Sequence, residues 1–242
     1  MRLITTTFFL SIIVLQLYAQ DTTAFVSIWQ TSNISTGSTD EFTIKIPTHS
    51  GHTYDYEVDW DGDGTYDESG ITGSAVHTYL NPGKYRIRIR GTFPRIHFNN
   101  TGDRLKILEI EQWGSSQWEN MNSAFDGCAN LVEEAKDAPD LSIVASMSAM
   151  FRRATNFTGD LSNWDVSNVP WMVATFQNAS SFNGDISMWD IGDVNSIRFM
   201  FDGASSFNQD ISQWDLSNVA TFNIPFVMLL LLIRTWRRGI WS

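Results

Sequence analysis

Apolar residues recur at a fixed interval of 25 positions along the second half of the chain. Trp164, Trp189 and Trp214 mark the interval, and an aspartate follows each of them. Phenylalanine keeps the same interval at further positions of the unit, and two weaker copies precede these at residues 113–125 and 140–151. A repeat of this length predicts a solenoid, because each unit is too small to bury its apolar side without its neighbours.

The spacing of apolar residues changes halfway through each unit. Ile186, Trp189 and Ile191 suit a short strand with a bend, whereas residues 194–204 place apolar side chains at steps of three and four. The second spacing predicts one face of a short helix, with Asp193 as its N-cap. We therefore expect units of strand, turn and short helix, whose structural rungs are Phe157, Trp164, Phe176, Phe182, Trp189, Phe201, Phe207 and Trp214.

Residues 24–98 follow a different pattern. Segments such as 41–46, 54–60 and 84–90 alternate apolar and polar residues, with Gly, Pro and Asp between them. Short alternating strands with frequent turn signals predict a small all-β sandwich. The expected fold class is therefore mixed α/β, with a sandwich over residues 21–100 and a repeat array over residues 101–226.

The two ends of the chain depart from both patterns. Residues 1–20 join a basic start to an apolar run and small residues, which predicts a secretory signal peptide and a secreted or cell-surface protein. Residues 227–242 form an atypical apolar and basic tail, and the apolar stretch leading into it is shorter than the roughly 20 residues that span a bilayer. Three explanations stay open: a membrane-associating tail, an apolar cap, or a truncation or frame-shift product. We expect membrane association through this tail only.

Two segments carry a resemblance to known families. The repeat FNQDISQWDLSNV at residues 207–219, with copies at 157–169 and 182–194, resembles the BspA-type leucine-rich-repeat surface proteins of bacteria. That resemblance implies a leucine-rich-repeat-like solenoid, export to the cell surface and a role in adhesion. The stretches VDWDGDGTYD at 58–67 and VHTYLNPGKYRIRIRG at 76–91 resemble a PKD-type domain, which implies an immunoglobulin-like sandwich.

Charge and residue types narrow the functional classes. The chain has 16 basic and 27 acidic residues, and this net charge of -11 argues against nucleic acid as a partner. Cys128 is the single cysteine, so the sequence predicts no disulfide framework. No HExxH motif and no Ser or Cys nucleophile motif accompanies the four histidines. We predict no catalytic residue and a protein that is not an enzyme.

One loop carries the pattern of a cation site. Its sequence DWDGDGTYD places Asp59, Asp61, Asp63 and Asp67 within nine residues, and Thr65 offers a backbone carbonyl. Alternating carboxylates in a glycine-containing loop are ligands that Ca²⁺ prefers, although Gly70 stands where an EF-hand has its bidentate glutamate. The alternative is a hairpin turn in which Asp and Gly serve backbone needs. Ca²⁺ is the one cofactor that the sequence suggests, and both interpretations stay open.

The repeated polar residues have a structural and a functional interpretation. We expect the tryptophans to be buried, and we consider an exposed platform for sugars the weaker alternative. We expect the repeated aspartates to cap backbone N–H groups rather than to bind cations. Positions at which two nearly identical copies differ predict the outward binding surface, and these are Gly184, Met188, Gln209 and Gln213.

The predicted function is binding or adhesion to an unknown extracellular protein or glycan through the array. One alternative is a carbohydrate-binding accessory module or a fragment of a larger surface enzyme. Another alternative is a structural stalk.

Overall fold

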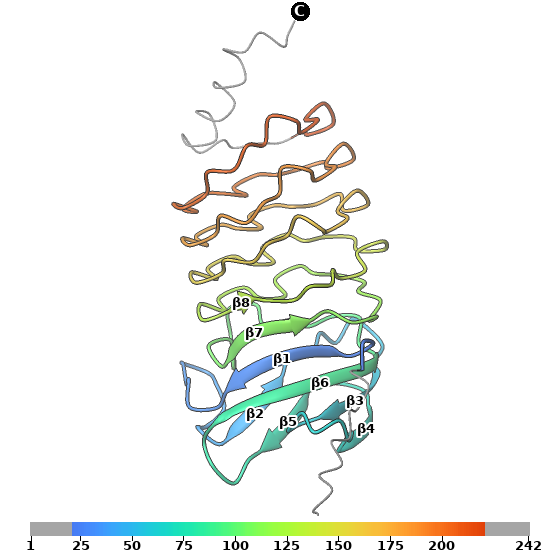
Figure 1. Cartoon of the computed structure of the whole chain (residues 1–242), viewed down its shortest axis with the longest axis vertical. Helices are drawn as coiled ribbons and strands as arrows, with labels where there is room; N and C mark the ends of the chain where they lie inside the picture. Colours follow the sequence, from blue (N-terminus) through green and yellow to red (C-terminus); the bar gives the residue numbers. More distant parts are fainter. Residues whose placement is uncertain (1–20, 221–242) are drawn as a thin grey trace, which may run out of the picture.

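The computed structural model describes residues 21–220, which form one elongated stack (Figure 1). The predicted signal peptide, the predicted tail and the last six residues of the predicted array lie outside these residues. The strands are β1 (Phe25–Gln30), β2 (Thr43–Ile46), β3 (Asp55–Asp59), β4 (Glu68–Ile71), β5 (Ala75–Thr78), β6 (Lys84–Thr92), β7 (Ile107–Gln112) and β8 (Val132–Glu133).

Two sheets form the lower part of the stack. One has six strands in the order β4-β3-β6-β1-β7-β8, and the other pairs β2 with β5. Alternate residues are buried in β3, at Tyr56 and Val58, and in β6, at Ile87 and Ile89. In β1, which lies between β6 and β7, Phe25–Trp29 are all buried. Apolar side chains of both sheets belong to a single core.

The six-stranded sheet connects the two predicted parts of the chain. β1 pairs antiparallel with β6 on one side and with β7 on the other, and β7 pairs in parallel with β8. β7 and β8 belong to the predicted array, so the sheet crosses from the predicted sandwich into the repeats. The buried apolar cluster is likewise continuous from Phe25 to Val219.

Above β8 the repeat units stack in parallel (Figure 1). Alternate amides from Met147 to Arg153 donate hydrogen bonds to alternate carbonyls from Trp171 to Gln177, with N···O distances of 2.8–2.9 Å. The next unit repeats the pattern, since alternate amides from Met172 to Asn178 donate to carbonyls from Ser196 to Asp202. Bonding of every second residue is the pattern of a parallel sheet, and it aligns equivalent residues of successive units.

The prediction of short helices in the repeats is wrong. Residues 21–220 contain no helix, and their regular secondary structure is entirely β. No segment of this part of the chain therefore forms a helix that could cross a membrane. Residues 194–204, which were expected to be helical, instead form tight turns, in which Met200 and Ala204 donate their N–H groups to the carbonyls of Ile197 and Phe201.

A left-handed residue within each of these segments explains why no helix forms. Ala149, Ala174 and Phe199 have φ angles of 55°, 57° and 59°. A second left-handed residue follows four positions later in each unit, at Arg153, Asn178 and Gly203, with φ angles of 61°, 60° and 73°. A helix needs consecutive residues in the right-handed region, so these two residues per unit interrupt it. The apolar steps of three and four residues reflect the length of the tight turns.

The eight predicted rungs are all buried. Phe151, Phe176 and Phe201 stack with ring centroids 5.8 Å apart and planes within 9° of parallel. A second column of phenylalanines runs beside it, with centroids 5.8–5.9 Å apart. The indole N–H groups of Trp189 and Trp214 donate to the carbonyls of Leu161 and Ile186 at 3.0 Å. These tryptophans are therefore part of the core and do not form a platform for sugars.

Candidate functional site

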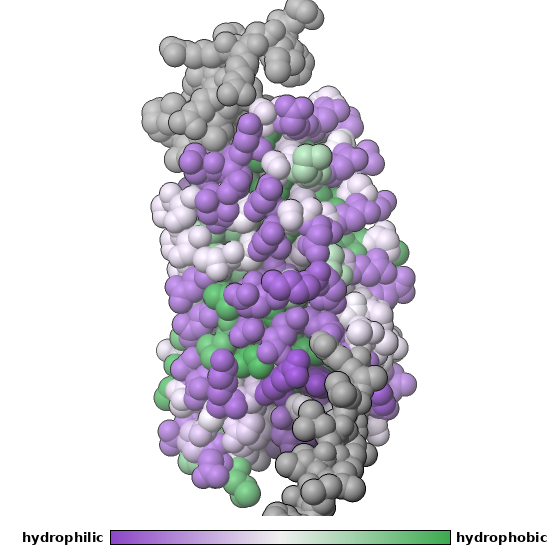
Figure 2. Space-filling view, in the orientation of Figure 1, coloured by the Kyte–Doolittle hydropathy of each residue, from purple (hydrophilic) through white to green (hydrophobic). Residues whose placement is uncertain are grey.

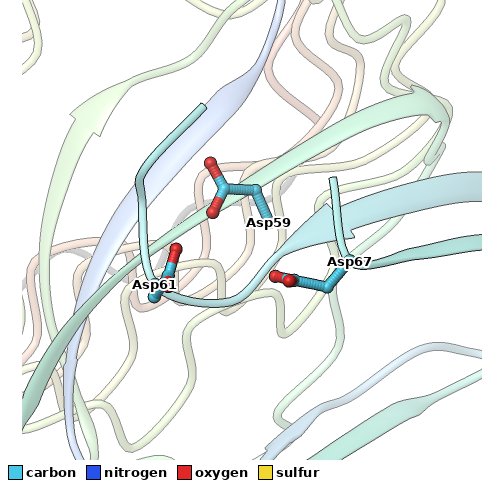
Figure 3. Close-up of side chains that lie close together, drawn as sticks. All are labelled: Asp59, Asp61 and Asp67. Carbon is cyan, nitrogen blue, oxygen red and sulfur yellow. The ribbon is translucent and has the colours of Figure 1, made fainter. Parts of the chain in front are cut away.

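The acidic loop between β3 and β4 brings three of its predicted residues together (Figure 3). Asp59, Asp61 and Asp67 each place one carboxylate oxygen within 4.8 Å of the other two. Asp63 is not part of this group, and its carboxylate accepts a hydrogen bond from the N–H of Thr65 at 2.7 Å. The structure thus separates the five predicted residues into a convergent set of three and a turn formed by the other two.

Backbone groups already bind the convergent carboxylates. The buried Asp59 accepts hydrogen bonds from the N–H groups of Gly62 at 2.7 Å and Gly64 at 2.9 Å. Both glycines have positive φ angles, of 77° and 95°, which favour glycine in this turn. Asp67 accepts a hydrogen bond from the N–H of Trp60 at 2.8 Å. Each of these contacts is what the hairpin-turn interpretation requires.

The carboxylate of Asp59 also lies close to the positive charge of Arg88. Burial raises the pKa of its carboxyl, while the two glycine N–H groups and the Arg88 guanidinium lower it. The Nε atom of Arg88 lies 3.7 Å from Asp59 Oδ2. A cation in this loop would therefore be held mainly by the exposed carboxylates of Asp61 and Asp67. Three carboxylate oxygens are fewer than the six to eight ligands of Ca²⁺, so backbone carbonyls or water would complete the shell.

The repeated aspartates of the array cap the backbone, as predicted. Each accepts a hydrogen bond from the N–H group two residues later, at N···O distances of 2.9–3.1 Å. The capping residues are Asp140, Asp160, Asp165, Asp185, Asp190, Asp210 and Asp215. Such bonds satisfy donors that the bends of each unit leave without a ladder partner.

The four positions predicted to face a ligand do not share one environment. Met188 is 79% exposed and Gln213 is exposed. Gln209 is half-buried and donates a hydrogen bond to the carbonyl of Asn183 at 2.7 Å. Gly184 is buried, which corrects its predicted outward position.

Close stacking of the units explains the burial of Gly184. A Cβ atom at this position would overlap with the carbonyl oxygen of Gly159, the equivalent glycine of the preceding unit. The glycine is thus required by the approach of two backbones and is not a freely varying surface position.

Trp171 is an exposed aromatic residue that the repeat analysis missed. Its side chain is 47% exposed, whereas the equivalent positions hold the serines Ser146 and Ser196. The backbone of Trp171 pairs through a parallel bridge with that of Ser196, so this residue lies where two successive units are hydrogen-bonded to each other. The departure from the repeat was visible in the sequence as the segment PWM in place of ASM and NSI.

Polar side chains dominate the face of the array seen in Figure 2, with apolar ones scattered between them. Exposed apolar residues of the array include Ile143, Trp171 and Met188, and each occupies a different position of its unit. Residues that repeat are therefore buried or bound to the backbone, while these exposed residues are specific to one unit.

Residues 119–229 match a family model described as "Mycoplasma protein of unknown function, DUF285". This family is found in BspA-like surface proteins. The match covers just under half of the chain and lies over the repeat array. No curated protein and no solved structure matches the chain.

Proposed function

We propose that the chain is an exported bacterial cell-surface protein of BspA type, which binds an extracellular protein or glycan through its array without catalysing a reaction. The observation that carries this proposal is that repeated residues and unit-specific residues of the array have different environments. The repeated phenylalanines, tryptophans and aspartates are buried or cap the backbone, whereas unit-specific residues such as Trp171, Met188 and Gln213 are exposed. A scaffold of constant core residues with changing outward residues is how solenoid proteins present a binding surface.

Two further features support the same proposal. The array matches a family that occurs in BspA-like surface proteins. The exposed Trp171 is a large amphipathic side chain, and tryptophan is enriched among the residues that dominate the energetics of binding surfaces. In this proposal residues 21–100, called the β-rich part below, are a PKD-like module. Their acidic loop holds Ca²⁺ between Asp59, Asp61 and Asp67, which is supported by the convergence of these carboxylates.

A binding screen against immobilised glycans and extracellular matrix proteins tests the proposal. The full chain is compared with the triple variant Trp171→Ala, Met188→Ala, Gln213→Ala. The matched control is Leu80→Ala, because Leu80 is 95% exposed but lies in the β-rich part. We expect the triple variant to lose at least tenfold in affinity for a bound partner, as loss of one interface hot spot often does, and the control to bind normally.

Other outcomes of the screen would identify the alternatives. Turnover of a bound sugar would overturn the proposal in favour of a carbohydrate-processing enzyme. Equal binding by the triple variant would place the binding surface outside the array. Absence of binding to any component would favour a structural stalk.

A further inference from the structure

Three histidines gather around one buried arginine at the start of the array. We define the junction cluster as His49, His52, Arg95, His97 and Glu119. The His49 ring centroid lies 4.9 Å from that of His97 and 5.7 Å from that of His52. Arg95 is buried, and its Nη1 atom lies 3.4 Å from Nε2 of His52. Residues from three separate segments of the chain therefore meet at one point.

The cluster connects residues 47–54, the loop before β3, to the array. His52 Nδ1 lies 2.7 Å from the carboxylate of Glu119, which is in the array. The N–H of His97 donates to the carbonyl of Pro47 at 3.1 Å, and the Tyr54 hydroxyl donates to the carbonyl of Arg95 at 2.9 Å. Arg95 Nη2 donates to the carbonyl of Asn122 at 2.9 Å. These contacts hold residues 47–54 in place.

The hydrogen bonds of the rings require unprotonated nitrogen atoms. His49 Nδ1 accepts a hydrogen bond from the N–H of Gly51 at 3.1 Å. His52 Nδ1 faces the carboxylate of Glu119, and its Nε2 faces the Arg95 guanidinium. Protonation of His49 would convert its Nδ1 acceptor to a donor, and protonation of either His49 or His97 would place new positive charge beside Arg95.

Few negative charges are available to balance such protonation. Glu119 contacts His52 directly, and it is half-exposed. Asp126 also acts on His97, but its carboxylate already pairs with Arg152 and Arg153. The Nε atom of Arg95 has no hydrogen-bond partner among the described residues. The cluster therefore contains one fixed cation, one contacting anion, and two rings, His49 and His97, whose pKa values are lowered by burial and by Arg95.

We propose that the junction cluster is an acid-sensitive latch, which holds residues 47–54 against the start of the array at neutral pH and releases them in acid. Protonation of His49 and His97 would place two further positive charges beside the buried Arg95. Because like charges in a partly desolvated site repel strongly, the contacts of the loop would be lost before the rest of the fold.

The direction of the pH effect follows from the histidine pKa values. Burial is the main cause that lowers the pKa of His97 to about 4, and the positive charge of Arg95 and the ring of His49 contribute to this lowering. Burial, Arg95 and His52 also lower the pKa of His49. A lowered pKa means that His49 and His97 bind protons more tightly in the released state than in the latched state. The latch is therefore fully closed above the ordinary histidine pKa of about 6.5 and weakens as the pH falls toward about 4.

Amide hydrogen exchange of the full chain at pH 7 and pH 4.5 tests the latch. The amides of Gly51 and His97 report on it directly, because they bind His49 Nδ1 and the Pro47 carbonyl. We expect their protection factors to fall by at least about tenfold in acid, since each unit of pKa difference changes the equilibrium about tenfold. The amides of Phe176 and Asn178, which bind the next unit, should keep their protection.

Two variants separate the latch from a general acid response. His97→Phe keeps an aromatic ring but removes the titrating group with the lowest pKa, so the loss of protection should move to lower pH. His77→Phe is the matched control, because His77 stacks on Trp60 at 5.0 Å and does not belong to the cluster. It should respond to acid like the natural chain.

NMR titration of the histidines provides a measurement that needs no variant. The latch requires His97 to titrate well below 6.5, in step with the exposure of the Gly51 amide. Titration of His97 at 6.5 or above, or constant protection of residues 47–54 down to pH 4.5, would overturn the proposal. An identical acid response in His97→Phe and the natural chain would also overturn it.

Discussion

At the scale of single residues, Glu133 is a carboxyl in an unfavourable environment. Its Oε1 atom accepts a hydrogen bond from the Trp113 indole N–H at 2.7 Å, whereas its buried Oε2 atom has no hydrogen-bond partner within residues 21–220. Burial is the main cause that raises the pKa of Glu133 to about 8, and the charges of Asp137 and Asp160 contribute to this rise, while the hydrogen bond from Trp113 opposes it. The folded protein therefore keeps this carboxyl protonated at neutral pH, while the unfolded chain ionises it near 4.5.

Replacement of Glu133 by glutamine should stabilise the protein at neutral and alkaline pH. A raised folded-state pKa means that stability is greatest below pH 4.5 and falls as the pH rises to about 8. Glutamine keeps the acceptor for Trp113 but cannot ionise, so Glu133→Gln should recover roughly 3 kcal/mol at pH 7. Urea unfolding at pH 5 and pH 8 measures this difference. Glu134→Gln is the control at an exposed neighbouring position and should have almost no effect.

A second prediction at this scale concerns Gly184. Its substitution by alanine forces a methyl group onto the carbonyl of Gly159, so Gly184→Ala should lower the free energy of unfolding by about 1–3 kcal/mol. Gly192→Ala in the same unit is the matched control, because a Cβ atom added there would lie 3.3 Å from its nearest neighbour, Oδ1 of Asp190. Chemical denaturation compares the two. Equal stability of both variants would mean that the units are packed less closely than this contact requires.

At the scale of elements, the acidic loop distinguishes a cation site from a hairpin turn. If Ca²⁺ binds, millimolar Ca²⁺ should raise the melting temperature of the natural chain, because a ligand of the folded state stabilises it. Asp61→Asn should abolish this rise, whereas Asp63→Asn should keep it, because Asp61 belongs to the convergent group and Asp63 does not. Differential scanning fluorimetry with and without Ca²⁺ measures the effect. An unchanged melting temperature at millimolar Ca²⁺ would leave the loop as a turn alone.

The elements also show which parts of the fold could be predicted from the sequence. The 25-residue period predicted the stacked units and their buried rungs, because burial of Phe176 or Trp189 depends only on regular spacing. The helices were wrongly predicted, because successive tight turns produce the same steps of three and four. A positive φ angle such as that of Ala174 cannot be recognised from the sequence. Alanine at a left-handed position looks like a good helix former.

The candidate site was predictable to a similar, limited extent. The alternating aspartates identified a loop whose carboxylates converge, but sequence spacing could not separate Asp63 from Asp61. The comparison of two copies identified the exposed Met188 and Gln213. It misplaced Gly184, because contact between units involves residues 25 positions apart and not neighbours in the chain. The junction cluster joins residues 49 to 119 and had no local signature at all.

At the scale of the whole molecule, the β-rich part covers one end of the repeat stack. A solenoid exposes apolar surface at its terminal units, which usually need a capping structure. Here β1 and β7 continue the hydrogen-bonded ladder, and Phe25 packs against Trp113 and Trp118 with ring centroids 5.7 and 5.5 Å apart. The β-rich part therefore protects the first repeat unit in addition to any role of its own.

This continuity predicts that residues 21–220 unfold in one cooperative transition, although repeat arrays often lose their units in succession. Gly114 is the position to test, because it has a φ of 68° and an added Cβ would overlap with the carbonyls of Thr23 and Ala24. Gly114→Ala should destabilise β1 and the repeats together. Gly73→Ala, where an added Cβ meets no atom within 4 Å, is the matched control.

Calorimetry and hydrogen exchange distinguish cooperative from sequential unfolding. In the cooperative case the calorimetric and van't Hoff enthalpies agree, and Gly114→Ala lowers the protection of β6 amides and of the Phe176 amide by the same factor. Two separate transitions would contradict the prediction, as would a loss of protection confined to one side of Gly114. The second result would mean that contact between β1 and β7 transmits too little energy to couple the β-rich part to the repeats, despite their shared sheet and core.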